Sequence, residues 1–156
     1  ESFFKGPAIF LLRKTIQPAF SYVNFPCYVT RSFLVLKPRN INLKYLTAVL
    51  NSKLTYFWLK NKGKKQGEQL QIDKEPLLDI PLLKTDEGEQ NRIAALVDTV
   101  IARNAELHKT SANTDKWHAL KTEIKKSESE IDQEIYKLYK LTREEIDTVE
   151  NSSKIL

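Results

Sequence analysis

The stretch that decides the fold runs from Pro76-Leu77-Leu78-Asp79-Ile80-Pro81-Leu82-Leu83 into Glu89-Gln90-Asn91-Arg92-Ile93-Ala94-Ala95-Leu96-Val97. The first part is a short apolar run with two prolines, and the second spaces its apolar residues as one face of a helix. Charge changes sign here. Residues 1–75 carry 13 basic and 4 acidic side chains, a net charge of +9, whereas residues 76–156 carry 12 and 16, a net charge of −4. We expect a basic, mixed part before this junction and an acidic, helical part after it.

The part before the junction predicts a small, mostly antiparallel sheet. Its short runs of apolar, β-branched and aromatic residues are separated by prolines and polar turns, which is typical of strands. The predicted strands are Ala8–Arg13, Ala19–Val23, Tyr28–Thr30 and Ser32–Leu36, with Asp79–Leu83 returning to the sheet.

One helix is predicted to pack on this sheet, from Leu43 to about Lys60. Its apolar residues fall three or four positions apart, Asn42 is suited to cap its start, and Gly63 is suited to cap its end. A short helical turn is expected at Lys74–Leu78 with Asp73 as its cap.

Helices are predicted for the rest of the chain. Asp86 and Glu89 have the spacing of a capping box and begin a helix that reaches about His108. A second helix over Asp115–Tyr139 has a near-heptad apolar pattern, so the two should pack as an antiparallel pair. Thr142 and Glu145 open a short last helix, and residues 151–156 are expected to fray. The predicted fold is α+β, with a globule at residues 1–84 and a helical scaffold at residues 85–156.

Composition sets limits on the protein class. The longest apolar run, Ala8–Leu12, is too short to cross a bilayer, so no membrane contact is expected. A single cysteine, Cys27, cannot form an intramolecular disulfide, which favours a reducing cytoplasm. The chain begins at Glu1 and has no methionine, which favours a piece of a larger protein.

Catalytic patterns are missing from the sequence. The four glycines form no phosphate-binding loop, and His108, His118 and Cys27 are too few for a zinc site. Glu123-Ile124-Lys125 has the Glu-x-Lys spacing of some nucleases, but it lies in a predicted heptad helix and is interpreted as an ion-pairing face. We expect no catalytic residue, metal or cofactor in this chain.

A polar stretch at residues 61–71 is the strongest candidate for a nucleic-acid contact. It combines lysines, which neutralise phosphates, with glutamines, which can pair with adenine in the major groove. It has no apolar periodicity and is predicted to be a loop. The candidate DNA-binding residues are Lys60, Lys62, Lys64, Lys65, Gln66, Gln69 and Gln71, followed by Arg13, Lys14 and Arg31.

Four motifs, in the same order along the chain, resemble one family. They are the opening strand Phe4–Arg13, the helix Asn42–Leu54 with its Leu50-Asn51-Ser52, the junction Pro76–Leu82 with Glu89–Ile93, and the ending Ile131–Ile146. Together they resemble the target-recognition (TaqI-like C-terminal specificity) domain of fused type II restriction–modification enzymes and adenine-specific DNA methyltransferases, which is related to type I specificity subunits. The chain departs from the family pattern at Leu83, where a second proline is usual.

The resemblance implies a part of an enzyme that reads double-stranded DNA. The family's Asn-Pro-Pro-Tyr/Phe motif and glycine-rich S-adenosylmethionine loop are missing from the chain. A catalytic methyltransferase domain that uses S-adenosylmethionine and modifies adenine N6, with or without endonuclease activity, is therefore expected elsewhere in the parent protein. The resemblance does not assign base-reading positions, because these vary with the target sequence.

Two other functions remain open from the sequence. The helical pair could itself be the working part of a protein-interaction adaptor. An RNA-binding module is the second alternative, although exposed aromatic residues for base stacking would be expected there.

Overall fold

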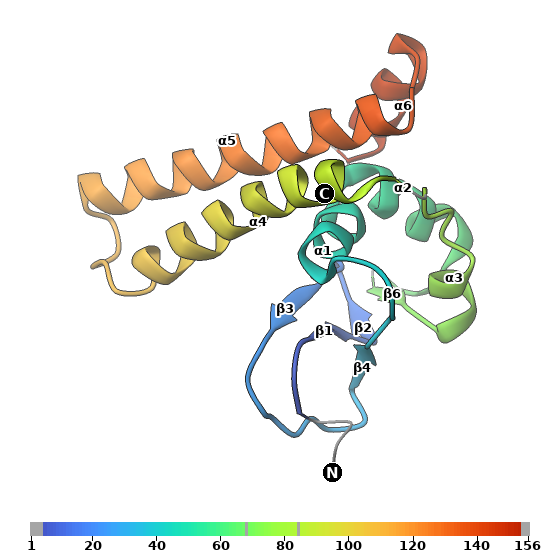
Figure 1. Ribbon diagram of the computed structural model, residues 1–156, viewed down its shortest axis with the longest axis horizontal. Coiled ribbons are helices and arrows are strands. Elements are labelled where there is room, and N and C mark those ends of the chain that lie inside the picture. Colours follow the sequence, from blue (N-terminus) through green and yellow to red (C-terminus); the bar gives the residue numbers. More distant parts are fainter. Residues whose placement is uncertain (1–4, 68, 84, 154–156) are drawn as a thin grey trace.

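A computed structural model describes residues 5–67, 69–83 and 85–153, except the side chains of Lys65 and Gln66. Residues 1–4, 68, 84 and 154–156 lie outside this description, including Phe4 of the first motif and the end of the expected frayed tail. Figure 1 shows an antiparallel pair of long helices, α4 (Glu87–Leu107) and α5 (Asp115–Leu138), lying over a smaller part that contains the strands. The α+β prediction is confirmed.

The first sheet is antiparallel and has the order β3-β1-β4. Its strands are β1 (Ala8–Leu12), β3 (Ser21–Val23) and β4 (Phe33–Leu36). Ile9 and Leu11 of the central strand are buried against the helices behind it. The strand predicted at Tyr28–Thr30 is wrong, because these residues form no strand and the Thr30 carbonyl instead accepts the Phe33 amide, at 3.1 Å, in the turn before β4.

The polar stretch predicted as a loop is instead a β-hairpin. Its strands β5 (Lys64–Gln66) and β6 (Gln69–Gln71) pair with the short strand β2 (Lys14–Thr15) in the order β2-β6-β5. Gly67 takes a positive φ of 63° in the turn, which glycine adopts without strain. The loop prediction was wrong because the apolar signal of this hairpin is only Leu70 and the adjoining Ile72, both buried.

The predicted helix at Leu43–Lys60 is broken into α1 (Leu43–Asn51) and α2 (Lys53–Lys62). Ser52 lies between them with an extended ψ of 152°, and its hydroxyl accepts a hydrogen bond from the Thr55 amide. The amide of Lys53 is bound by the carboxylate of Asp132 on α5, at 2.8 Å. The apolar pattern alone could not show this break, because part of the new helix start is capped from a distant segment.

The proline-containing run forms one helical turn and then an irregular segment. α3 (Lys74–Leu78) confirms the predicted turn. The strand predicted at Asp79–Leu83 is wrong, because these described residues pair with no strand of either sheet. Two of their carbonyl groups bind side chains instead. The hydroxyls of Tyr139 and Tyr45 donate to the carbonyls of Pro81 and Leu83, at 2.8 and 3.4 Å.

The helical part agrees closely with its prediction. α4 (Glu87–Leu107) and α5 (Asp115–Leu138) pack against each other, and α6 (Arg143–Ser153) follows. The Glu89 amide binds the Asp86 carboxylate at 2.9 Å, and Thr142 and Glu145 cap each other's amides. α6 remains helical through Ser153, so the fraying expected from residue 151 is wrong up to that point.

Two hydrophobic cores hold these elements together. The first lies between the sheets, α1 and α2, and contains Ile9, Leu50 and Leu59. The second joins Tyr45 and Val49 of α1 to Ile93 of α4 and Ile135 of α5. It therefore crosses the predicted boundary between residues 84 and 85, which stays a prediction. In the described part of the chain, none of the helices is long and apolar enough to cross a membrane.

Candidate nucleic-acid interface

Three of the predicted DNA-binding residues form one row across the second sheet. Gln71 of β6 lies directly opposite Lys14 of β2 on one side and Lys64 of β5 on the other. Residues directly opposite one another project from the same face of a sheet. Leu70 and Ile72 are buried, whereas Lys14 is exposed and the Lys64 side chain is 80% exposed. The row therefore presents an amide between two cations on the outer face.

Arg13 precedes Lys14 and lies between the two sheets. Its amide donates to the Ser32 carbonyl at 2.9 Å, and its carbonyl accepts from the Ile72 amide at 2.8 Å, so Arg13 joins both sheets. Arg31 precedes Ser32, and the side chains of Arg13 and Arg31 are both exposed. We call Lys14, Gln71 and Lys64 the basic row.

Two further glutamines and one lysine of the prediction lie at the hairpin turn. Gln66 and Gln69 are opposite each other in the register, and Lys65 is opposite Leu70. Gln69 is exposed. The side chains of Lys65 and Gln66 lie outside the described part of the structure, so only their backbone positions can be given.

Lys60 and Lys62 lie on α2 and contact other groups of the chain. The ammonium of Lys60 donates to the Ser152 carbonyl at 2.8 Å and lies 5.9 Å from the Tyr56 ring centre. Lys62 lies over the ring of Trp58, at 5.6 Å. Lys60 therefore connects α2 to α6, and it is not brought into the basic row.

Asp73 is a residue of this surface that the sequence assigned to helix capping. The Gln71 amide nitrogen donates to its carboxylate, with N–O distances of 3.1 and 3.4 Å, and the Lys64 ammonium lies 3.7 Å from Oδ2. The sequence signal for this contact was the spacing: in extended backbone, residues two positions apart, such as Gln71 and Asp73, lie on the same face. Asp73 also borders a cleft of about 710 Å³ lined by Trp58, Lys62, Lys64, Glu75, Pro76 and Asp79.

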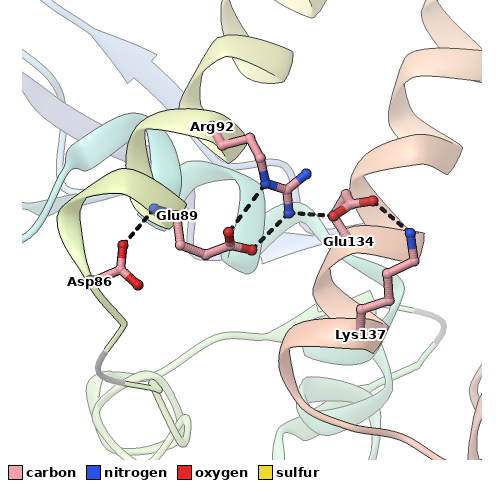
Figure 2. A network of polar contacts seen from close by, with 5 residues as sticks. All are labelled: Asp86, Glu89, Arg92, Glu134 and Lys137. Atoms are coloured by element: carbon pink, nitrogen blue, oxygen red, sulfur yellow. Dashed lines mark hydrogen bonds and ion pairs between the residues drawn. The ribbon is translucent and has the colours of Figure 1, made fainter.

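The helical pair is joined near the globule by a network of charges, drawn in Figure 2. Arg92 of α4 donates to Glu89 at 2.7 Å and also to Glu134 of α5, which in turn binds Lys137 at 2.9 Å. Hydrogen bonds from Lys137 and Arg92 hold the pKa of Glu134 below its ordinary value. The start of α4 is thereby linked to the end of α5.

The residues beside Arg92 connect the helical pair to the globule. The Gln90 side-chain oxygen accepts the Asn42 amide at 2.9 Å, and the Asn42 side chain donates to that of Asn91 at 3.0 Å. Asn42 itself caps α1 by accepting from the amides of Lys44 and Tyr45. The sequence predicted the cap at Asn42 but gave no sign of its partners on α4.

A second polar cluster fixes the break between α1 and α2. The buried Asp132 binds the Lys53 amide and lies 3.7 Å from the Lys53 ammonium, which also pairs with Glu150 at 2.7 Å. Burial raises the pKa of Asp132 to about 6, although hydrogen bonds and charge from Lys53 act in the opposite direction. Glu150 accepts from the Tyr136 hydroxyl at 3.0 Å. The cluster holds α2, α5 and α6 together.

The surface described above is suited to binding a polyanion. Cations on an exposed face can neutralise phosphates, and an amide between them can form hydrogen bonds with base edges. In residues 5–67, 69–83 and 85–153 we find no group of three or more His, Cys, Asp or Glu side chains arranged to hold a metal ion.

Comparison with known proteins gives related sequences and a related structure. Two relatives are type II methyltransferases from Haemophilus influenzae, M.HincII and, from strain KW20/Rd, M.HindII. Each is 31% identical over an alignment of 116 residues, and the match covers 67% of this chain but only 23% of M.HincII and 22% of M.HindII. The chain thus spans less than a quarter of their length.

The solved structure of the type IIL restriction–modification enzyme MmeI in complex with DNA has the same fold over 96% of this chain and 22% of that one, with a TM-score of 0.69 and 9% identity. The family model for the TaqI-like C-terminal specificity domain matches residues 1–82, which is more than half of the sequence. The chain therefore belongs to the family of TaqI-like C-terminal specificity domains found in restriction–modification proteins.

Proposed function

We propose that this chain recognises a specific sequence in double-stranded DNA for a bacterial type II methyltransferase. Membership of a specificity-domain family supports a role in DNA target recognition. The observation that carries the proposal for this chain is the Lys14–Gln71–Lys64 alignment across three adjacent strands. Lysines contact phosphates of any sequence, whereas a side-chain amide can distinguish bases in the major groove.

The proposal divides the work between this chain and the rest of its protein. The chain supplies DNA contacts and no catalytic group. A methyltransferase domain in the same protein would bind S-adenosylmethionine and transfer the methyl group to adenine N6, in the bacterial cytoplasm. The two methyltransferase relatives, each more than four times longer than the matched region, support this division.

The rigid attachment of the globule to the helices suits this role. Tyr45 and Val49 of α1 share a core with Ile93 and Ile135 of the long helices. Base readout needs side chains held at a fixed distance from the reacting part of an enzyme, because a small displacement removes hydrogen bonds. The helical pair would hold the basic row at a fixed position relative to the catalytic domain.

The test measures binding of the full-length protein to duplex DNA as a function of salt. Binding should weaken steeply with salt, and Lys14→Glu or Lys64→Glu should weaken binding to all sequences. Each should also lower the slope of log affinity against log salt by about 1 for every phosphate that is no longer neutralised. Lys126→Glu is the matched control, because Lys126 is exposed on α5, a different element from the hairpin.

Three results would contradict the proposal. One is equal loss of affinity in the Lys126→Glu control and the basic-row variants. Another is binding that does not respond to salt. A preference for single-stranded RNA over duplex DNA in the same assay would favour an RNA-binding module instead.

A further inference from the structure

An acidic side chain lies directly beside the glutamine of the basic row. Asp73 accepts a hydrogen bond from Gln71 Nε2, at 3.1 Å to Oδ1 and 3.4 Å to Oδ2. The Asp73 side chain is only 20% exposed, and the Lys64 ammonium lies 3.7 Å from its Oδ2. A carboxylate beside a surface that binds phosphates opposes that binding, so its presence calls for a specific role.

Helix capping does not account for this carboxylate. Asp73 occupies the position before α3, where an aspartate side chain commonly accepts a hydrogen bond from the first turn. The Asp73 side chain makes no such bond to α3. Its oxygens bind Gln71 and Lys64 instead.

The pairing with Asp73 fixes the orientation of the Gln71 amide. An ionised carboxylate only accepts hydrogen bonds, so the NH₂ group of Gln71 must face it and the amide cannot be reversed. One hydrogen of the NH₂ group serves Asp73. The second hydrogen and Oε1 are left for a ligand, as one donor and one acceptor of the same amide.

This donor–acceptor pair matches one base edge. In the major groove adenine presents N7 as an acceptor beside the N6 amino group as a donor, and glutamine binds both at once. Guanine presents two acceptors, N7 and O6, so Oε1 of a fixed amide would face an acceptor there. A glutamine free to reverse its amide would discriminate less between the two purines.

We propose that Asp73 is a positioning residue that locks the Gln71 side-chain amide for reading an adenine in the DNA major groove. Lys14 and Lys64, on either side of Gln71, hold the flanking phosphates. This inference rests on the proposed DNA-recognition function. It adds that the base read by Gln71 is an adenine and that Asp73 sets the preference for adenine over guanine.

The test is selection of binding sites from a randomised duplex library by the full-length protein and its variants. Asp73→Asn keeps the size of the side chain, but its amide can donate as well as accept, so Gln71 is no longer locked. At one position of the selected site the preference for adenine over guanine should fall about fivefold or more. Total binding should be unchanged or higher, because a negative charge has been removed.

Gln71→Ala supplies the control for mechanism. It should abolish the same preference, and Asp73→Asn introduced into that variant should change the preference no further. If Asp73→Asn alters affinity equally for all sequences, the positioning role is overturned while the basic row still stands through Lys14→Glu and Lys64→Glu. If all four single variants bind and select as the unchanged protein does, both this inference and the proposed function fail.

Discussion

The side chain of Gln90, at the start of α4, accepts a hydrogen bond from the backbone amide of Asn42, the residue that caps α1. The two residues are 48 positions apart, and the N–O distance is 2.9 Å. Gln90 also donates to the Thr85 carbonyl at 3.1 Å. One side chain therefore joins the globule, the connecting segment and the helical pair.

Replacing Gln90 by alanine should lower the free energy of unfolding by about 1–3 kcal/mol. The reason is that the part-buried Asn42 amide loses its acceptor. Urea denaturation measures the change. Gln133→Ala is the matched control, because Gln133 is exposed on α5 and its replacement should change stability by at most about 0.5 kcal/mol. Equal effects of the two substitutions would contradict the link.

Asp132 predicts a pH-dependent stability. Its pKa is raised in the folded protein from 3.8 to about 6, so between these values the folded state binds more protons than the unfolded state. Stability should therefore fall as pH rises from about 4 to about 6, by as much as about 3 kcal/mol for this group alone. Hydrogen bonds and charge from Lys53 lower the pKa of Asp132 and limit this change, whereas the charge of Glu150 raises the pKa.

Asp132→Asn isolates this contribution. The asparagine oxygen can still accept from the Lys53 amide, but it does not titrate. The difference in unfolding free energy between the two proteins should change across this pH range and stay constant above about pH 7. A constant difference throughout, measured by denaturation at each pH, would show that the pKa of Asp132 is not raised.

Gly63 ends α2 at a point where no side chain fits. A Cβ atom added there would lie 2.5 Å from the Leu59 carbonyl oxygen, although the φ of −74° is open to any residue. Gly63→Ala should destabilise the protein by about 1–3 kcal/mol through this clash, as measured by its thermal midpoint.

Gly88, in the first turn of α4, is the comparison for Gly63. A Cβ atom there meets Oδ1 of the capping Asp86 at 3.2 Å, and a shift of this side chain by a few tenths of an ångström relieves the contact. Gly88→Ala should be neutral or stabilising by up to about 1 kcal/mol, because alanine favours helix. If both alanine variants lose the same stability, steric clash at Leu59 is not the cause.

Lys60 has a structural contact with α6 and differs in this from the lysines of the basic row. Its ammonium binds the Ser152 carbonyl of α6. Lys60→Ala should lower the free energy of unfolding by roughly 0.5–1.5 kcal/mol and leave the salt dependence of DNA binding unchanged. Lys64→Ala should leave the free energy of unfolding nearly unchanged and reduce the salt dependence of DNA binding. Denaturation and salt titration of both variants are the measurements. A reduced salt slope in Lys60→Ala would return this residue to the DNA surface.

Local patterns determined the helical half of the protein. Helices α4, α5 and α6 begin at caps formed by residues a few positions away, such as Asp86 with Glu89 and Thr142 with Glu145. Their apolar spacing also specified the antiparallel pair. The sequence by itself likewise placed the cations and glutamines of the candidate interface in one segment.

Tertiary structure decided the features that depend on distant partners. The α1–α2 break is capped by Asp132, 79 positions from Lys53, and the polar segment forms strands because β2 pairs with it. Only this pairing puts Lys14 beside Gln71 and turns Asp73 toward the same amide. Such contacts are set by cross-strand register and by burial of Leu70 and Ile72. The residues next to each other in the sequence do not show which distant strand will pair with them.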